Sequence, residues 1–138
     1  MKLSKVKFII QSQKVKNSSM SLCISVNNKT YNYNELNQNN EIEIDIKFPS
    51  ICKFETYGKN EKDTIVDKDG KITQDKYIIL KDIQVDGFSV DPHYLTRFVN
   101  FHTEKNGTIA TNFWSFNGIC LIDFSPTPFQ WLAQTKKN

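Results

Sequence analysis

Apolar and polar residues alternate along most of this chain, and a period of two is the pattern of a β-strand with one buried face. In the clearest run, residues 41–48, every second residue is apolar: Ile42, Ile44, Ile46 and Phe48. Charged residues fill the positions between them: Glu43, Asp45 and Lys47. This run predicts a strand with one face in the core and the other in water.

Similar runs recur from end to end. They predict further strands over residues 5–11, 20–26, 31–33, 52–57, 77–85, 98–103, 108–116 and 119–124. Between the strands stand turn dipeptides suited to positive φ: Asn27-Asn28, Asp69-Gly70, Asn106-Gly107 and Asn117-Gly118. The one helix-start signal, Asp91-Pro92, predicts at most a short helical turn near residues 92–96. We therefore expect an all-β fold, an antiparallel β-sandwich of jelly-roll type, with residues 1–138 forming a single domain.

Charge and cysteine content narrow the classes of function. The 18 basic and 15 acidic residues are spread along the chain, and Arg97 is the sole arginine, so nucleic-acid binding is not expected. Cys23, Cys52 and Cys120 lie far apart in apolar runs, which indicates buried free thiols in a reducing compartment. The apolar stretch Phe8-Ile9-Ile10 is too short for a signal sequence or a membrane span, so we expect a soluble protein.

The sequence carries no recognisable catalytic motif. Only His93 and His102 supply imidazoles, and neither stands in a pattern with a nucleophile or with metal-binding neighbours. The five glycines are scattered at turns and form no phosphate-binding loop. The chain is therefore predicted not to be an enzyme, with no catalytic residue assigned.

The densest group of oxygen donors is an acidic loop that could hold a hard cation such as calcium. Its members are Asn60, Asp63, Asp67, Asp69 and Asp75. An EF-hand is excluded, because a loop with Gly70 at its sixth position would begin at Ile65 and end at Lys76. The alternative, which we favour, is a plain hairpin turn at Asp69-Gly70 with the other aspartates in solvent.

Exposed aromatic rings are the usual stacking platforms of sugar-binding surfaces. The predicted ligand-binding residues are Trp114, Trp131 and Tyr57. Alternation over residues 112–116 places either Trp114 or Phe113 on the core face, and the sequence leaves that choice open.

Two resemblances add to this picture. The stretch from Tyr57 to Gly87, with its Asp69-Gly70-Lys71-Ile72 and Ile83-Gln84-Val85-Asp86-Gly87 motifs, resembles a pattern in small proteins of marine tailed bacteriophages. The run from Asp75 to Ile83 that leads to Asp86-Gly87 is also distantly similar to calcium-dependent xylan-binding modules, which are β-sandwiches that hold sugar hydroxyls directly on the ion. That similarity implies Asn60, Asp63 and Asp75 as calcium ligands, with Lys76 where the family more often has arginine.

The expected function is that of a non-enzymatic structural or accessory protein of a phage virion, on its capsid or tail, that presents a glycan-binding loop. The alternative is a free-standing, calcium-dependent carbohydrate-binding module. The expected partners are other virion proteins or a surface glycan, with a homo-oligomer compatible and no nucleic acid or membrane involved. The expected location is the virion, after synthesis in the host cytoplasm. No cofactor is required, and calcium is the one candidate.

Overall fold

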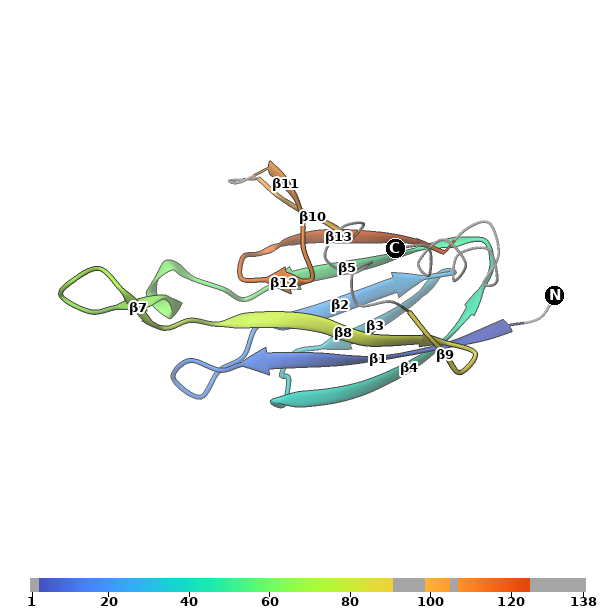
Figure 1. Ribbon diagram of the computed structural model, residues 1–138, viewed down its shortest axis with the longest axis horizontal. Coiled ribbons are helices and arrows are strands. Elements are labelled where there is room, and N and C mark those ends of the chain that lie inside the picture. The colour runs from blue at the N-terminus through green and yellow to red at the C-terminus, as the bar shows by residue number, and fades with distance from the viewer. Residues whose placement is uncertain (1–2, 91–98, 105–106, 125–138) are drawn as a thin grey trace.

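The predicted strands form two antiparallel sheets that pack face to face (Figure 1). The computed structural model describes residues 3–90, 99–104 and 107–124. The first sheet has the order β12-β8-β1-β4, with β9 beside β8. Its strands are β1 (Leu3–Gln13), β4 (Asn39–Lys47), β8 (Tyr77–Val85), β9 (Phe88–Ser89) and β12 (Phe113–Trp114).

The second sheet has the order β11-β10-β13-β5-β2-β3. Its strands are β2 (Ser21–Val26), β3 (Lys29–Tyr33), β5 (Ser50–Tyr57), β10 (Asn100–Thr103), β11 (Gly107–Ala110) and β13 (Gly118–Phe124). The chain crosses repeatedly between the two sheets, and every strand pair is antiparallel. The predicted fold class, an all-β antiparallel sandwich, is confirmed.

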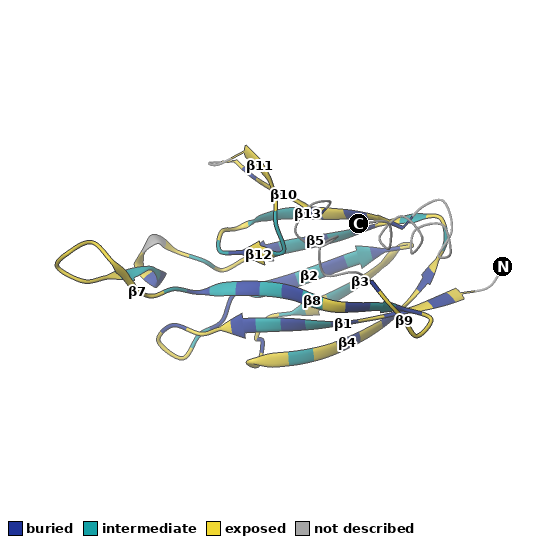
Figure 2. Cartoon of the chain, viewed as in Figure 1, coloured by how far each residue is buried: buried dark blue, intermediate teal, exposed yellow. Residues whose placement is uncertain are grey.

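Alternation sorts each long strand into a core face and a solvent face, as Figure 2 shows by its regular change of colour along the strands. On β4 the buried residues are Ile42, Ile44 and Ile46. The intervening Glu43 and Asp45 are exposed, as the sequence predicts. The inward residues of both sheets join in one apolar cluster in which Phe8 of β1 meets Phe54 of β5 edge-on, with ring centroids 5.6 Å apart.

A third, two-stranded sheet projects beyond one end of the sandwich, at the left of Figure 1. It is the hairpin β6 (Ile65–Val66) and β7 (Ile72–Gln74), which follows a 3₁₀ turn, η1 (Glu61–Asp63). Gly70 has a φ of +83°, and the Asp67 carboxylate accepts hydrogen bonds from the backbone N–H groups of Asp69 and Lys71, each at 2.9 Å. The predicted Asp69-Gly70 turn is thus present and is closed by Asp67.

The predicted strand over residues 108–116 is wrong as a single element. Its first half is β11, which pairs with β10 in the second sheet, whereas its second half is β12, which pairs with β8 in the first. The hydroxyl of Thr111 accepts a hydrogen bond from the N–H of Phe113 at 3.0 Å, which marks the bend between the two halves. A period of two shows which residues share a face, but it does not show in which sheet they lie.

The predicted helical turn near residues 92–96 lies outside the described residues. Within residues 3–90, 99–104 and 107–124 the one helical turn is η1, at a place that the sequence does not predict. The proposed single domain over residues 1–138 extends beyond the described ranges and stays a prediction. The three cysteines are free, with Cys52 and Cys120 buried and Cys23 half-buried.

Candidate ligand-binding cleft

An open cleft of about 550 Å³ lies beside the ends of β5, β10 and β13, on the second sheet. The buried side chain of Thr56 lies at one edge of this cleft. Its hydroxyl donates a hydrogen bond to the carbonyl of Phe116 at 2.8 Å and accepts one from the N–H of Gly118 at 3.0 Å. These bonds fasten the loop between β12 and β13 to the end of β5. The residues that line the cleft are Glu55, Thr56, Tyr57, His102, Thr103, Glu104, Phe116, Asn117, Gly118 and Ile119.

Two exposed aromatic rings line this cleft. Tyr57 is the last residue of β5 and points outward by the alternation of that strand, with 36% of its surface exposed. Phe116 lies in the loop before β13 and is 46% exposed. Aromatic side chains with a few placed polar groups are the usual lining of a small-ligand site.

Asn117, the residue after Phe116, is hydrogen-bonded to the backbone of Lys59, two residues after Tyr57. Its side-chain carbonyl accepts from the N–H of Lys59 at 2.9 Å, and its amide donates to the carbonyl of Lys59 at 3.0 Å. The ammonium of Lys59 lies 5.3 Å from the ring centroid of Phe116, a cation–π contact. The orientation of Phe116 is therefore coupled to the segment that follows Tyr57.

The carboxylate and imidazole groups of the described lining are those of Glu55, Glu104 and His102. The Nδ1 atom of His102 lies 2.8 Å from the hydroxyl of Thr108 on the neighbouring strand. Glu55 lies 3.9 Å from the ammonium of Lys53 in an exposed ion pair. No lysine or arginine is among the described residues that line the cleft, so the lining suits a neutral, hydroxyl-rich ligand.

A cleft that gathers His102 with two carboxylates also raises the question of catalysis. A general acid or base is normally tuned by burial or by a close charged neighbour. His102 and Glu104 are exposed, and Glu55 is paired with Lys53 at the surface. These surface groups can exchange hydrogen bonds with a ligand in the cleft.

The acidic loop lies next to the cleft, between β5 and β8, and we call residues 58–76 the aspartate loop. Asp63 is buried, and its Oδ2 accepts from the N–H of Asn60 at 2.7 Å and lies 3.2 Å from the Nζ of Lys76. Burial opposes ionisation of Asp63, but the hydrogen bonds from Asn60 and Lys76 and the charges of Lys76 and Lys16 outweigh it and lower its pKa.

Asp75, the other predicted carboxylate ligand, has three partners on one of its oxygens. Its Oδ1 pairs with the ammonium of Lys59 and accepts hydrogen bonds from the hydroxyl of Thr64 and the N–H of Lys76, both at 2.9 Å. In the described residues no group of three or more acidic, histidine or cysteine side chains is arranged to hold a metal ion. Calcium takes six to eight oxygens at about 2.3–2.6 Å. This donor set, whose two carboxylates are each paired with a lysine, does not fit it.

The three predicted sugar-binding aromatics have different outcomes. Tyr57 lies in the cleft, and Trp131 lies outside the described residues. Trp114 is fully buried, with its indole N–H donating to the carbonyl of Thr111 at 3.0 Å and its ring stacked on Phe101 at 5.6 Å, so it offers no face to a ligand. Because β12 joins the first sheet, Trp114 turns inward and Phe113 outward. The choice that the sequence left open is thereby resolved.

Sequence reasoning did not nominate Phe116, His102 or Glu104 for this site. The sequence carries one weak indication that Phe116 is exposed, because this residue precedes the turn dipeptide Asn117-Gly118. Gly118 itself does not have positive φ. A Cβ there would lie 2.5 Å from the backbone oxygen of His102, so close packing between β13 and β10 is what requires glycine.

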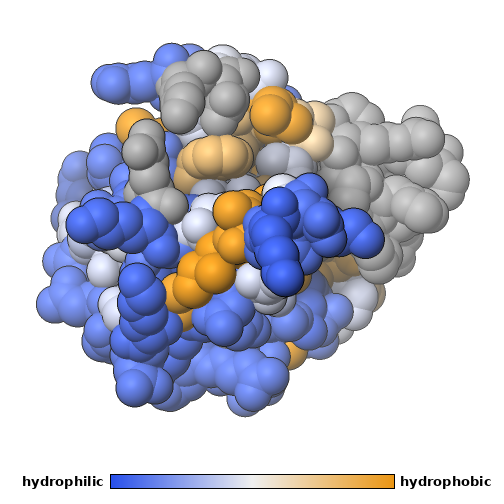
Figure 3. All heavy atoms as spheres, turned by 90° about the vertical axis from the view of Figure 1, so that its left-hand side faces the viewer, coloured by the Kyte–Doolittle hydropathy of each residue, from blue (hydrophilic) through white to orange (hydrophobic). Residues whose placement is uncertain are grey.

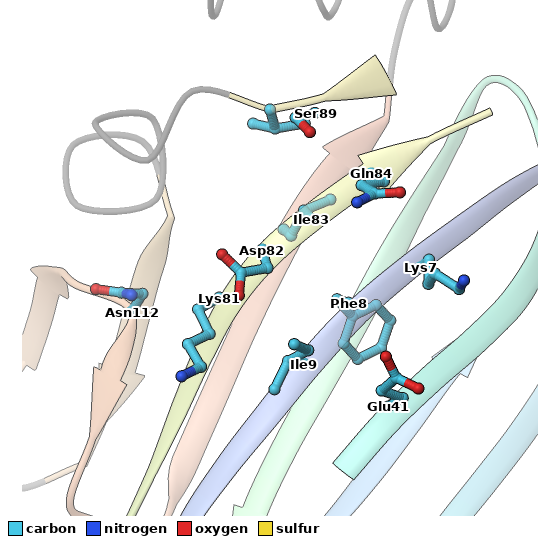
Figure 4. A pocket seen from close by; sticks show the side chains of 11 residues that line it. Lys7, Phe8, Ile9, Glu41, Lys81, Asp82, Ile83, Gln84, Ser89 and Asn112 are labelled. Atoms are coloured by element: carbon cyan, nitrogen blue, oxygen red, sulfur yellow. The ribbon is translucent and has the colours of Figure 1, made fainter. Parts of the chain in front are cut away.

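A second hollow of similar volume lies over the outer face of the first sheet (Figure 4). Strand β8 bulges opposite β1 here, and Asp82 has a φ of +55°. Lys81 and Asp82 both reach the surface at the bulge. No exposed aromatic ring is among the described residues lining this hollow, which makes it a poorer match to a sugar than the cleft.

Two solved structures of a carbohydrate-binding module are similar to this chain in fold. The chain is similar to the selenomethionine form of vCBM60, from a study of two families of calcium-dependent carbohydrate-binding modules, with a TM-score of 0.50 and 11% identity over 87% of this chain and 90% of that one. It is also similar to vCBM60 in complex with galactobiose, with a TM-score of 0.49 and 13% identity over 86% and 97% of the two chains. No family model and no curated protein sequence matches the chain.

These likenesses concern the sandwich architecture. The predicted bacteriophage role, the virion location and the homo-oligomer gain no support from them and stay predictions. Within the described residues no helix is both long and apolar enough to cross a membrane.

Proposed function

We propose that the protein is a non-enzymatic glycan-binding module that holds a neutral oligosaccharide in the cleft between Tyr57 and Phe116. The observation that carries this proposal is the pair of exposed rings at one cleft, with carboxylate, imidazole and hydroxyl groups around them and no lysine or arginine in the described lining. The likeness of the fold to a carbohydrate-binding module adds support.

The chemistry of the cleft defines the class of ligand. A sugar ring presents an apolar face that can stack on Tyr57 or Phe116, while its hydroxyls both donate and accept hydrogen bonds. Glu55 and Glu104 accept such bonds, and they repel carboxylated or sulfated sugars. Neutral glycans should therefore bind in preference to polyanionic ones.

A glycan array followed by calorimetry on the best neutral oligosaccharide tests the proposal. Tyr57→Ala and Phe116→Ala should each weaken binding about tenfold or more, as expected for aromatic hot spots. Phe113→Ala is the matched control, because Phe113 is an equally exposed phenylalanine, at 44%, on the strand β12 of the other sheet. Equal losses in all three variants, or no neutral glycan bound at all, would refute the proposal.

The predicted virion role is a separate question that glycan binding would not answer. Mass spectrometry of purified particles tests it, and absence from every virion fraction would refute it.

A further inference from the structure

Lys76 is a buried lysine whose ammonium is surrounded by oxygen atoms. Its side chain is 4% exposed, and its Nζ lies 3.2 Å from the carboxylate of Asp63, 3.3 Å from the carbonyl of Gly58 and 3.5 Å from the hydroxyl of Ser18. Lysine is almost never buried without a partner, because an unpaired ammonium loses its hydration. A carboxylate, a backbone carbonyl and a hydroxyl are also the kinds of oxygen ligand that a hard cation takes.

Lys59 is a second lysine of the aspartate loop whose buried side chain pairs with an aspartate. Its side chain is 8% exposed, and its ammonium pairs with the carboxylate of Asp75 while lying over the ring of Phe116. Asp63 and Asp75 are thus each neutralised by one lysine of the same chain. Among the ion pairs of the described residues, the two that hold Asp63 and Asp75 are shielded from solvent. The other two lie outside the loop and involve exposed side chains.

The two ammonium groups also hold the segment that builds the cleft. Lys76 binds the carbonyl of Gly58, the residue directly after Tyr57. The backbone of Lys59 is held by Asn117 on one side, and its side chain contacts Phe116 on the other. Lys59 therefore links the aspartate loop to Phe116, and Lys76 holds the start of the loop, directly after Tyr57.

We propose that Lys76, together with Lys59, is the built-in cation of the aspartate loop, so that the loop folds and the cleft binds its ligand without a divalent metal. A calcium ion bound to the oxygens that now surround Nζ of Lys76 would have to displace this buried ammonium. Metal-free folding of the loop follows from these contacts alone. Metal-free ligand binding rests on the proposed function as well, so folding and binding are tested separately.

Thermal unfolding in calcium chloride and in excess chelator tests the folding statement on the full chain. The melting temperature of the unmutated protein should be the same in both, and calorimetry with calcium chloride alone should show no stoichiometric binding. A melting temperature that rises with calcium, or one calcium bound per chain, would overturn the proposal without the need for any variant.

A charge reversal then tests the position of the cation. Lys76→Glu places a carboxylate beside Asp63, so its melting temperature should fall in chelator and rise again with millimolar calcium. Lys62→Glu is the matched control, since it makes the same charge change at an exposed lysine of the same loop. A folded Lys76→Glu protein that responds to calcium no more than Lys62→Glu does would overturn the assignment of Lys76.

The effect of calcium on ligand binding is measured with a neutral oligosaccharide that the glycan array identifies. Its affinity for the unmutated protein should be equal in chelator and in calcium, and loss of binding in chelator would overturn the metal-free cleft. If no glycan binds, the proposed function fails while the thermal result for the aspartate loop still stands.

Discussion

The sandwich and the aspartate loop are held together by different forces. Between the sheets, fully buried apolar side chains such as Phe8, Phe54 and Ile46 contribute about 25 cal/mol per Å² of surface removed from water, with no need for a particular orientation. In the loop, Asp63 and Asp75 depend on one ammonium each, at fixed distances. The comparison shows that the core should tolerate changes of pH but not of apolar shape, whereas the loop should respond to single charges.

The largest effect is expected in the sandwich, from a charge placed in its core. Ile44→Asp should cost about 4 kcal/mol or more of unfolding free energy, because Ile44 is 3% exposed and a carboxylate there has no partner. Asp45→Ala, one residue further along on the solvent face, should stay within about 0.5 kcal/mol. Urea unfolding of both variants measures the difference. Equal losses would mean that the register of β4 is not the one described.

A steric change within the sandwich, where β13 packs against β10, should have the next largest effect. Gly118→Ala should cost about 1–3 kcal/mol, since the added methyl would meet the backbone oxygen of His102 and the ring of Phe101. Gly70→Asn, in the exposed turn of the aspartate loop, is the control: nothing lies within 4 Å of an added Cβ, and asparagine tolerates the left-handed backbone. Matching melting temperatures for the two variants would contradict close packing at Gly118.

Much of the sandwich was predictable because burial has a period that local sequence records. Strand β8 was predicted at both of its ends, and the β2–β3 hairpin was predicted from Asn27-Asn28, both of which have positive φ. Local sequence does not record which sheet a strand joins, so the run over residues 108–116 was predicted as one strand. The same limit hid the burial of Trp114.

The cleft was less predictable for a related reason. Tyr57 and Phe116 are far apart in the sequence and meet only because β5 pairs with β13 and Thr56 bonds to the loop before it. The aspartate loop shows the difference between composition and geometry. The sequence shows that lysines and aspartates occur together in residues 58–76, but the pairing of Asp63 with Lys76 depends on the buried position of that lysine.

Acid should weaken the aspartate loop before it affects the core. The pKa of Asp63 lies below the ordinary value for aspartate, so its ionised form stabilises the fold above about pH 4 and that stabilisation is lost as the pH falls through the folded-state pKa. Asp63→Asn should be less stable than the unmutated protein at pH 7, and the gap should close in acid. Asp69→Asn, at an exposed residue of the same loop, serves as the control. Thermal unfolding from pH 7 to pH 3 measures it, and a gap that does not change with pH would exclude the charged pair.

The smallest effect is expected in thiol labelling of the native protein. This measurement shows whether the sandwich and the aspartate loop unfold locally and independently of each other. Burial raises the pKa of both Cys52 and Cys120 to about 12, so both thiols stay protonated at pH 8, and both side chains are shielded in the core. Cys23 is half-buried on β2 and should react first with an alkylating reagent. Labelling of the two core thiols should follow the opening of the sandwich.

Lys76→Met separates the two regions in this assay. It removes the ammonium that neutralises Asp63 but changes no residue of the sandwich core, so native-state labelling of Cys52 and Cys120 should stay as slow as in the unmutated protein. Ile44→Asp should accelerate it, because that change weakens the core itself. Mass spectrometry of timed alkylation, with peptides assigned to each cysteine, gives the three rates. Fast labelling of all three thiols in the unmutated protein would contradict the buried core, and acceleration by Lys76→Met would show that loop and sandwich open as one unit.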